Sequence, residues 1–182
     1  MIYLISDDVY KKLSKHPKRL FHVNSVALTA VSLAKIYQID FKKTYIAAIM
    51  HDYAKYENDD FYNHYISEEL INKYQTTKVL YHSIAAANYA KIHYNIDEDI
   101  YNAIYNHVFG RPNMSVLEKI IFVSDSIYFT GKDHTIHLYD IALKDLNQAV
   151  IEAIRLTADS LNKRGLNLHL EQIETMNYYM KE

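Results

Sequence analysis

Residues 46–56 read IAAIMHDYAKY, an apolar helical pattern that ends in a histidine, an aspartate and a lysine. Lys55 follows Asp52 by three positions and His51 by four, so the three groups gather at one end of the predicted helix. Adjacent side chains on a helix diverge by about 100°. His51 and Asp52 can therefore reach one metal only from its rim, or reach two neighbouring metals. The His51-Asp52 dipeptide alone is weak evidence for a metal site, so the interpretation depends on the sequence around it.

Further potential metal ligands lie in apolar stretches on both sides of this segment. Burying an imidazole or an ionised carboxylate costs several kcal/mol unless the group is paired or ligated. Taken singly, each has an ordinary alternative: a satisfied core histidine, a charge at a helix end or a buried ion pair. Five helices that each supply such a group favour one shared centre of nitrogen and oxygen ligands, which suits Fe, Mn, Ni, Co or Zn. The ligand candidates are His22, His51, Asp52, His82, His107 and Asp125.

The other six histidines lie in polar stretches, beside a proline or near predicted helix ends, and we expect them on the surface. His169 would approach a bound ligand if the C-terminal segment folds over the pocket. The six are His16, His64, His93, His134, His137 and His169.

The chain is predicted to be all-α. It has 182 residues, of which 49% are hydrophobic, enough for one domain with a real core. Only 3 glycines and 2 prolines are available for turns, and helical periodicity runs almost unbroken. The predicted helices span about 6–14, 17–37, 40–56, 67–74, 79–93, 97–110, 115–128, 138–164 and 170–179, with loops at 57–63 and 129–137.

Composition also limits the partners and the compartment. The absence of cysteine removes disulfides and thiolate zinc sites, and a cytoplasmic protein fits this composition. No leader and no run of about 18 apolar residues is apparent, so no membrane association is expected. A net charge of -2 provides no basic footprint for long nucleic acids, whereas a small phosphorylated ligand needs only a few local cations.

The order H, HD, H, H, D over helical sequence resembles the HD-domain phosphohydrolase superfamily. The segments AAIMHDYAKY, YHSIAAANYA, NHVFGRPNMSVLEKIIFVSDSI and DIALKDLNQAVIEAI resemble, more narrowly, the YqeK family. These are bacterial enzymes that hold iron and split diadenosine tetraphosphate symmetrically into two ADP. The likeness runs from about residue 20 to 178. It implies a single-domain helical bundle over 1–182, with an HD core at about 18–130, C-terminal helices at about 138–180 packed on it, and a metal site in the bundle core.

The resemblance also implies roles for individual residues. The primary metal ligands would be His22, His51, Asp52 and Asp125, with His82 and His107 completing a second metal position or touching phosphate. Asp52, Lys55, His82 and His107 would form the catalytic group, with Asp52 orienting the attacking metal-bound water. Lys55 of HD-x-A-K and Arg111 of G-R-P-N-M-S would meet phosphate oxygens, and Ser25 would contact nucleotide. Iron is the implied cofactor, with Mn, Co, Ni or Zn as substitutes.

One segment departs from the family pattern. The family reads close to D-Y-I-E-P-N-R after its last metal ligand, whereas this chain reads DSIYFTGK from Asp125 to Lys132. Lys132 offers charge in place of the missing arginine but not a bidentate fork. Phe109 also stands where a threonine is common.

Two alternatives to a dinucleoside polyphosphate hydrolase stay open. The metal set is compatible with a phosphohydrolase of mononucleotides or cyclic nucleotides. A non-catalytic nucleotide-binding HD module is the other. A homodimer is the one protein assembly we consider.

Overall fold

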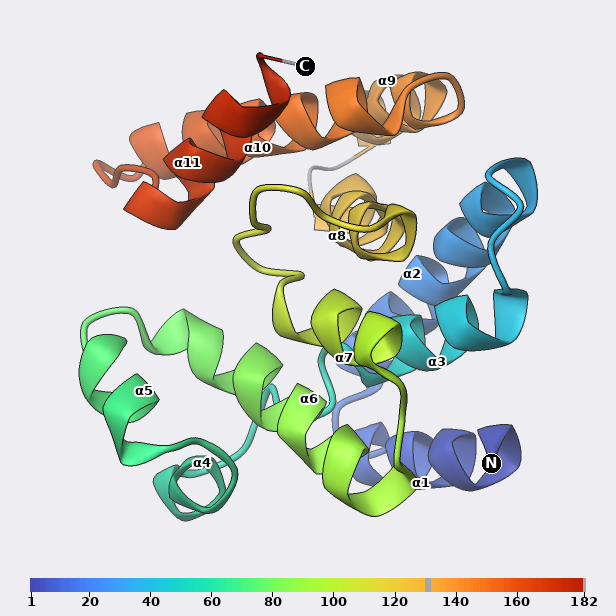
Figure 1. Ribbon diagram of the computed structural model, residues 1–182, viewed down its shortest axis with the longest axis vertical. Coiled ribbons are helices and arrows are strands. Elements are labelled where there is room, and N and C mark those ends of the chain that lie inside the picture. Colours follow the sequence, from blue (N-terminus) through green and yellow to red (C-terminus); the bar gives the residue numbers. More distant parts are fainter. Residues whose placement is uncertain (130–131, 182) are drawn as a thin grey trace.

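The computed structural model describes residues 1–129 and 132–181, excluding the side chains of 128, 129 and 132–135. All regular secondary structure in these residues is helical, as predicted (Figure 1). The elements are α1 (Ile2–Leu13), α2 (Pro17–Ile36), α3 (Phe41–Met50), α4 (Asp59–Tyr65), α5 (Glu68–Lys73), η1 (Lys78–Leu80), α6 (Tyr81–Tyr94), α7 (Glu98–Tyr105), α8 (Val116–Phe129), α9 (Lys132–Ala142), α10 (Leu146–Asn162) and α11 (Leu170–Tyr179).

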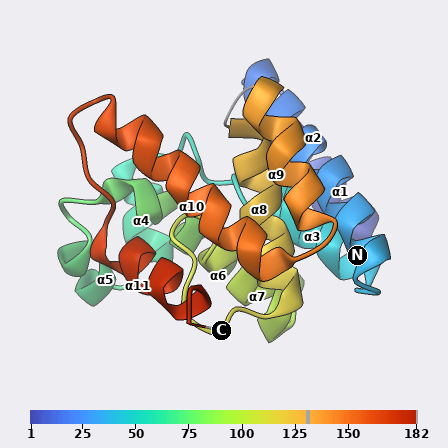
Figure 2. The same cartoon turned by 90° about the horizontal axis from the view of Figure 1, so that it is seen from above.

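The helices are arranged in tiers around α8. Helix α8 packs against α2 and α7 on one side and against α9 and α10 on the other. Figure 1 shows α9, α10 and α11 gathered beyond α8, and Figure 2 shows α10 crossing over it. Helices α1, α3, α6 and α7 form the opposite tier, where α3 packs on α2 and α7 packs on α6. The metal-ligand candidates come from α2, α6 and α8 and from the turns after α3 and α7, in the middle of this arrangement.

Several helix ends follow the predicted signals. The side chain of Asp40 accepts hydrogen bonds from the backbone amides of Lys42 and Lys43, and Asp97 accepts one from Ile100. Ser115 and Glu118 form the expected reciprocal capping box, with a 2.7 Å bond from the Ser115 amide to the Glu118 carboxylate and a 3.2 Å bond from the Glu118 amide to the Ser115 hydroxyl. These caps satisfy amides that have no partner within the helix.

The two predicted loops are wrong. Residues 57–63 are polar, yet α4 begins at Asp59, because Asn58 caps it and Phe61 and Tyr62 pack on the core. The second loop, at 129–137, is helical from Lys132 onward. Thr130 and Gly131 lie outside the described residues.

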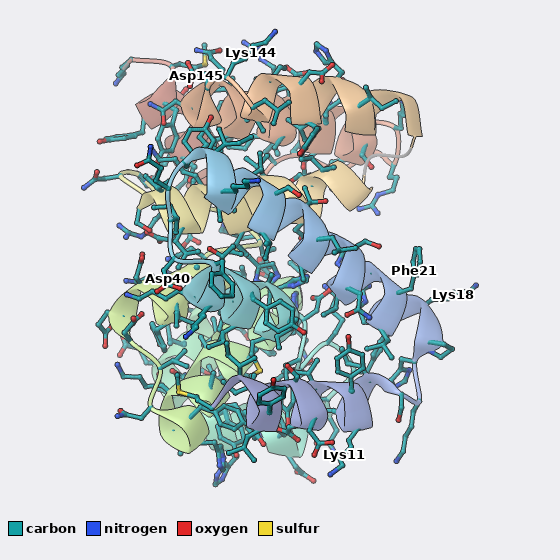
Figure 3. All side chains as sticks on the ribbon, turned by 90° about the vertical axis from the view of Figure 1, so that its right-hand side faces the viewer. Lys11, Lys18, Phe21, Asp40, Lys144 and Asp145 are labelled. Carbon is teal, nitrogen blue, oxygen red and sulfur yellow. The ribbon has the colours of Figure 1, made fainter. Side chains whose placement is uncertain are left out.

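Helix boundaries also differ from the prediction in three regions. The first helix begins at Ile2 rather than at Ser6. The predicted helix at 138–164 is two helices, because Asp145 turns out of the helix and its carboxylate caps α10 through the amides of Asn147 and Gln148. Figure 3 labels Lys144 and Asp145 at this break.

The third difference shapes the site. Helix α3 ends at Met50 and α7 at Tyr105, earlier than predicted, and the chain continues as tight turns. His51, Asp52 and His107 therefore lie on turns directly after helices. A turn frees adjacent side chains from the divergence that a helix imposes.

Among the described residues, every helix is too short or too polar to cross a bilayer.

Candidate metal centre

Asp52 lies at the centre of the ligand cluster, with one pair of histidines at each carboxylate oxygen. Its Oδ2 lies 3.3 Å from His22 Nε2 and 3.3 Å from His51 Nε2. Its Oδ1 lies 3.1 Å from His82 Nε2 and 3.9 Å from His107 Nε2. A carboxylate with its two oxygens turned toward two imidazole pairs can serve two neighbouring cations.

The sixth candidate, Asp125, closes the His22 side of the cluster. Asp125 Oδ1 lies 3.0 Å from His22 Nε2 and 3.7 Å from His51 Nε2. Its side chain is 28% exposed, whereas that of Asp52 is 3% exposed. Asp125 thus forms the open edge of the centre. The structure brings all six predicted ligands together.

The two histidines on turns, His51 and His107, are each held by a hydrogen bond to a backbone carbonyl oxygen. His51 Nδ1 lies 2.6 Å from the carbonyl oxygen of Ala48, and His107 Nδ1 lies 2.7 Å from that of Ile104. A carbonyl only accepts, so each Nδ1 carries the proton and each Nε2 keeps its lone pair in the neutral ring. Such an outer hydrogen bond fixes the tautomer and the orientation of metal-binding histidines.

The polar atoms at the centre fit a cation better than they fit one another. Nε2 of His22 faces Nε2 of His51 at 3.2 Å, and Nε2 of His82 faces Nε2 of His107 at the same distance. Asp52 Oδ1 is buried and accepts no hydrogen bond of acceptable geometry from the described residues. Among the described residues, two triads have their ligand atoms within 4.8 Å of one another: His22, His51 and Asp125, and His51, Asp52 and His107. The cluster can hold a divalent metal.

Burial keeps two of the histidines neutral. Burial and, after it, the neighbouring imidazoles of His51 and His82 lower the pKa of His107 to about 3. Burial also lowers the pKa of His82, although the nearby carboxylate of Asp52 acts to raise it. Both rings are therefore unprotonated at neutral pH, which is the state a metal requires.

The carboxylates are ionised. Burial acts to raise the pKa of Asp52, but the imidazoles of His51, His22 and His82 outweigh it and hold this pKa well below 3.8. Burial opposes the charge of Asp125 too, yet its hydrogen bond with His22 lowers its pKa to about 2. Imidazoles together with two carboxylates form a set of nitrogen and oxygen donors that suits a divalent transition metal.

The centre opens into a cavity of about 1010 Å³. One side is built by the start of α2, the turn after α3 and residues 76–79. The other is built by the end of α10 and the segment that leads into α11. Five cationic side chains line it: Lys18, Arg19, Lys55, Lys78 and Arg164. Among the described lining residues the only carboxylates are those of Asp52 and Asp125.

Lys55 and Arg19 lie directly at the ligands. Lys55 Nζ lies 3.1 Å from His82 Nε2 and 3.6 Å from Asp52 Oδ1. Arg19 forms an ion pair with Asp52 Oδ2. Arg19 was missed in the sequence, although a signal was present. It precedes His22 by three positions on one helix, which places both on one face.

Two of the other predicted residues lie away from the cavity wall. Arg111 donates from Nε and Nη2 to the two oxygens of Glu118, each at 2.7 Å, and it is not among the lining residues. A phosphate contact by Arg111 would require the guanidinium to leave Glu118. The Ser25 hydroxyl donates to the carbonyl of Phe21 at 2.9 Å, and Ser25 does not line the cavity either. The side chain of Lys132 lies outside the described residues.

The histidines expected on the surface differ in their exposure. His64, His93 and His137 are exposed, as predicted. His16 is partly buried and stacks on Tyr56, with ring centroids 4.0 Å apart. His169 lines the cavity, because the C-terminal segment does fold over it. The side chain of His134 lies outside the described residues.

Comparison with known proteins bears on the same residues. The HD domain family model matches residues 19–130, which include all six ligand candidates. Proteins named symmetrical bis(5'-nucleosyl)-tetraphosphatase from Halalkalibacterium halodurans and Bacillus subtilis are each 35% identical to the chain, over 93% of its length and 92% of theirs. The chain belongs to this family of HD-domain proteins. The resemblance seen in the sequence is confirmed.

A solved structure supports the same assignment of the HD fold. A predicted HD superfamily hydrolase involved in NAD metabolism, from Clostridium acetobutylicum, superimposes with a TM-score of 0.88 and 34% sequence identity. The match covers 100% of this chain and 97% of that one. The helices after residue 130, which the HD family model does not match, are therefore shared with this relative as well.

Proposed function

We propose that this protein hydrolyses diadenosine tetraphosphate into two molecules of ADP. As a member of the symmetrical tetraphosphatase family, the chain is a hydrolase. The observation that carries the proposal is the position of Asp52, whose two oxygens face two histidine pairs at the inner end of a cavity lined by five cations. Metal ligands beside several cations are what a phosphate chain requires.

We propose that the centre holds two neighbouring iron ions. His22, His51 and Asp125 would hold one of them and His82 with His107 the other, and Asp52 would be a ligand shared by the centre. Mn, Co, Ni or Zn are expected substitutes, because imidazole and carboxylate ligands suit all of them. When bound, such metals supply positive charge that polarises phosphate and makes water a stronger nucleophile near neutral pH.

Side chains around the phosphates would orient the attacking water and neutralise charge. Asp52 would orient the attacking water, since its carboxylate is ionised and central. Lys55 would neutralise charge on the phosphate chain as the leaving ADP departs, with Lys18, Arg19, Lys78 and Arg164 available along the cavity. Arg111, Ser25 and Lys132 stay predictions as substrate contacts. For Arg111 such a contact is in competition with Glu118.

The size of the cavity favours a dinucleotide over a mononucleotide. Small-molecule sites usually enclose roughly 300–1,000 Å³, and this cavity of about 1010 Å³ stands at the upper end. A mononucleotide would fill only part of this volume, whereas two nucleosides joined by four phosphates would fill more of it. A phosphohydrolase of mononucleotides or cyclic nucleotides is therefore the second candidate, and a non-catalytic nucleotide-binding module the third.

Product analysis tests the proposal. Iron-loaded protein is incubated with diadenosine tetraphosphate under reducing conditions, and the nucleotides are separated by ion exchange. We expect ADP as the only nucleotide product, and none with the Asp52→Asn variant. Asp60→Asn, which changes an exposed aspartate of α4, is the matched control and should keep full activity. AMP together with ATP, or cleavage of a mononucleotide in preference, would contradict the proposal. Tight binding without turnover would favour the non-catalytic module.

We also propose a cytoplasmic location and a homodimeric state. The absence of cysteine fits a reducing compartment. Light scattering at several protein concentrations measures the assembly, and a monomer throughout would refute the homodimer.

A further inference from the structure

Helix α1 contacts two of the elements that carry the ligand cluster. The carboxylate of Asp8, on α1, accepts hydrogen bonds from three tyrosine hydroxyls, all at its Oδ2. One of them, at 2.8 Å, comes from Tyr53, which directly follows Asp52 in the chain. The others, at 3.0 and 2.5 Å, come from Tyr89 and Tyr94 on α6, a helix with a ligand candidate in its first turn. Asp8 therefore joins the turn of Asp52 to α6.

A second residue of α1 contacts the same tyrosine. Lys12 follows Asp8 by four positions, so the two side chains share one face of the helix. The Nζ of Lys12 lies 4.4 Å from the centre of the Tyr53 ring and 2.7 Å from Oε1 of Glu57. Tyr53 is thus bound at its hydroxyl by a carboxylate and at its ring face by an ammonium, and it is only 3% exposed.

The turn after α3 depends on such an anchor. Asp52 lies beyond the last helical residue, Met50, and its carboxylate has no hydrogen bond to a backbone group like those that orient the two histidines on turns. Among the described residues, the polar contacts of this carboxylate are with the imidazoles of the centre and with Arg19 and Lys55, which line the cavity. The backbone of the turn therefore sets the direction of Asp52, and Tyr53 is the next side chain on that backbone.

Coverage of the core does not account for these polar contacts. Helix α1 packs on α2 and α3, and Figure 1 shows it beside α3. Its buried apolar residues, Ile5, Val9 and Leu13, already provide the packing. The Asp8 carboxylate is an addition to that apolar face. Helix α1 also precedes residue 19, where the match to the HD family model begins.

We propose that Asp8 is a positioning residue for the metal centre, which acts through Tyr53 on the direction of the Asp52 carboxylate. The proposal rests on the metal centre of the proposed function and is independent of which nucleotide is cleaved. It gives α1 a part in metal binding, although no ligand candidate lies on this helix.

Two phenylalanine variants separate this role from a contribution to stability alone. Tyr53→Phe and Tyr94→Phe each remove one hydroxyl from Asp8 Oδ2, but only Tyr53 adjoins a metal-ligand candidate. Asp8→Ala removes the acceptor itself. Asp7→Ala is its matched control, because the Asp7 side chain is the neighbour on α1 and is 60% exposed.

The measurement needs no substrate. Metal-free protein is titrated with Co²⁺ alone, at a temperature well below the melting temperature of every variant. The visible absorption of the bound ion gives the Kd and reports on the coordination geometry. Circular dichroism verifies that each variant folds, and melting temperatures without metal measure the loss of stability.

The expected result distinguishes the two tyrosines. The Kd for Co²⁺ should rise about tenfold in Tyr53→Phe and in Asp8→Ala, the lower end of the effect of removing an outer partner of a metal ligand. The Co²⁺ spectrum should change in both variants, because one ligand turns. Tyr94→Phe should lower the melting temperature by an amount similar to Tyr53→Phe, yet bind Co²⁺ like the wild type. Asp7→Ala should match the wild type in both measurements.

A double variant tests the route through Tyr53. Asp8→Ala combined with Tyr53→Phe should have the same Kd as Asp8→Ala, because both changes remove one and the same bond. Additive increases in Kd would mean that Asp8 does not act through Tyr53, and the proposal would be wrong.

Three further outcomes would overturn the proposal. An unchanged Kd in folded Asp8→Ala would show that Asp8 does not affect the centre. Equal increases in Kd in Tyr53→Phe and Tyr94→Phe would make the tyrosine cluster a source of stability alone. A wild type that binds no Co²⁺ would refute the metal centre and this proposal with it. A wild type that binds Co²⁺ but leaves diadenosine tetraphosphate intact would contradict only the proposed function, and the comparison of variants would still decide the role of Asp8.

Discussion

Arg111 donates two hydrogen bonds of 2.7 Å to the buried carboxylate of Glu118, from Nε to Oε1 and from Nη2 to Oε2. The same carboxylate accepts bonds from the Ser115 amide and from the Asn106 side chain. Glu118 is 1% exposed and therefore depends on these partners. The four bonds tie the turn that carries His107 to the start of α8. Arg111 accordingly acts on the position of a ligand in this arrangement.

Replacing Arg111 with leucine should therefore reduce stability. Glu118 would stay buried without its cationic partner, and we expect the free energy of unfolding to fall by about 2 kcal/mol. Urea denaturation followed by circular dichroism measures the change. Arg155→Leu, at an arginine that is 57% exposed, should leave the midpoint nearly unchanged. If Arg111→Leu unfolds at the wild-type urea concentration while KM rises, Arg111 is a substrate contact instead.

Asp8 provides a prediction for the dependence of stability on pH. Its Oδ2 accepts hydrogen bonds from the hydroxyls of Tyr53, Tyr89 and Tyr94, at 2.8, 3.0 and 2.5 Å. Burial acts to raise the pKa of Asp8, but these hydroxyls and the charge of Lys12 outweigh it and lower the pKa below 3.8. A lowered pKa in the folded state means that the stabilisation is present above about pH 4 and is lost as pH falls below that value.

We therefore expect Asp8→Asn to lower the free energy of unfolding by about 1–2 kcal/mol at pH 7. The gap between variant and wild type should close as the pH falls from 4 toward 2. Urea denaturation at pH 7, 5 and 3 measures the trend. A gap that stays constant across this range would show that the charge of Asp8 is unimportant.

Two glycines with similar backbones allow a steric contact to be measured. Gly110 has φ +67°, and an added Cβ would lie 2.9 Å from Thr175 Cγ2. Gly165 has φ +71°, and its Cβ would meet nothing within 4 Å among the described residues. Both alanine variants incur about 1–2 kcal/mol of backbone strain. Gly110→Ala should lose more than Gly165→Ala in thermal unfolding. Adding Thr175→Ser, which removes Cγ2, should restore part of the difference, and an equal loss in both single variants would contradict the contact.

Lys55 should act on the reaction rather than on the fold. Its Nζ lies between His82 Nε2 and Asp52 Oδ1, in the cavity. Lys55→Met is expected to lower kcat by roughly a hundredfold, because one charge that meets the phosphate chain is removed. Iron content and melting temperature should stay near the wild-type values. Lys11→Met, at an exposed lysine labelled in Figure 3, is the control. An unchanged kcat in Lys55→Met would remove Lys55 from the catalytic group.

The sequence was informative wherever one local rule decided the outcome. Asp40, Asp97 and Ser115 cap helices as predicted, because a capping side chain needs only its own neighbouring amides. The ligand candidates could be identified because a polar group in an apolar stripe requires compensation. That requirement predicts that the ligand candidates lie close together. It does not predict that Asp52 lies at the centre of the cluster.

What the sequence did not reveal depended on distant contacts. Arg19 looks like an ordinary surface cation until α2 places it on Asp52. The end of α3 at Met50 could not be read from periodicity, because the apolar pattern continues through Ala54. His169 reaches the cavity only because the chain turns back after α10 and α11 packs against α10, an arrangement that local sequence patterns do not predict.

The most direct test is elemental analysis of the purified protein after loading with iron under reducing conditions. We expect about two iron atoms per chain in the wild type, as in two-metal hydrolytic sites. We also expect a large loss of metal in Asp52→Asn together with loss of ADP formation, while Asp60→Asn keeps both. Retention of wild-type metal content and rate by Asp52→Asn would contradict the central position assigned to Asp52.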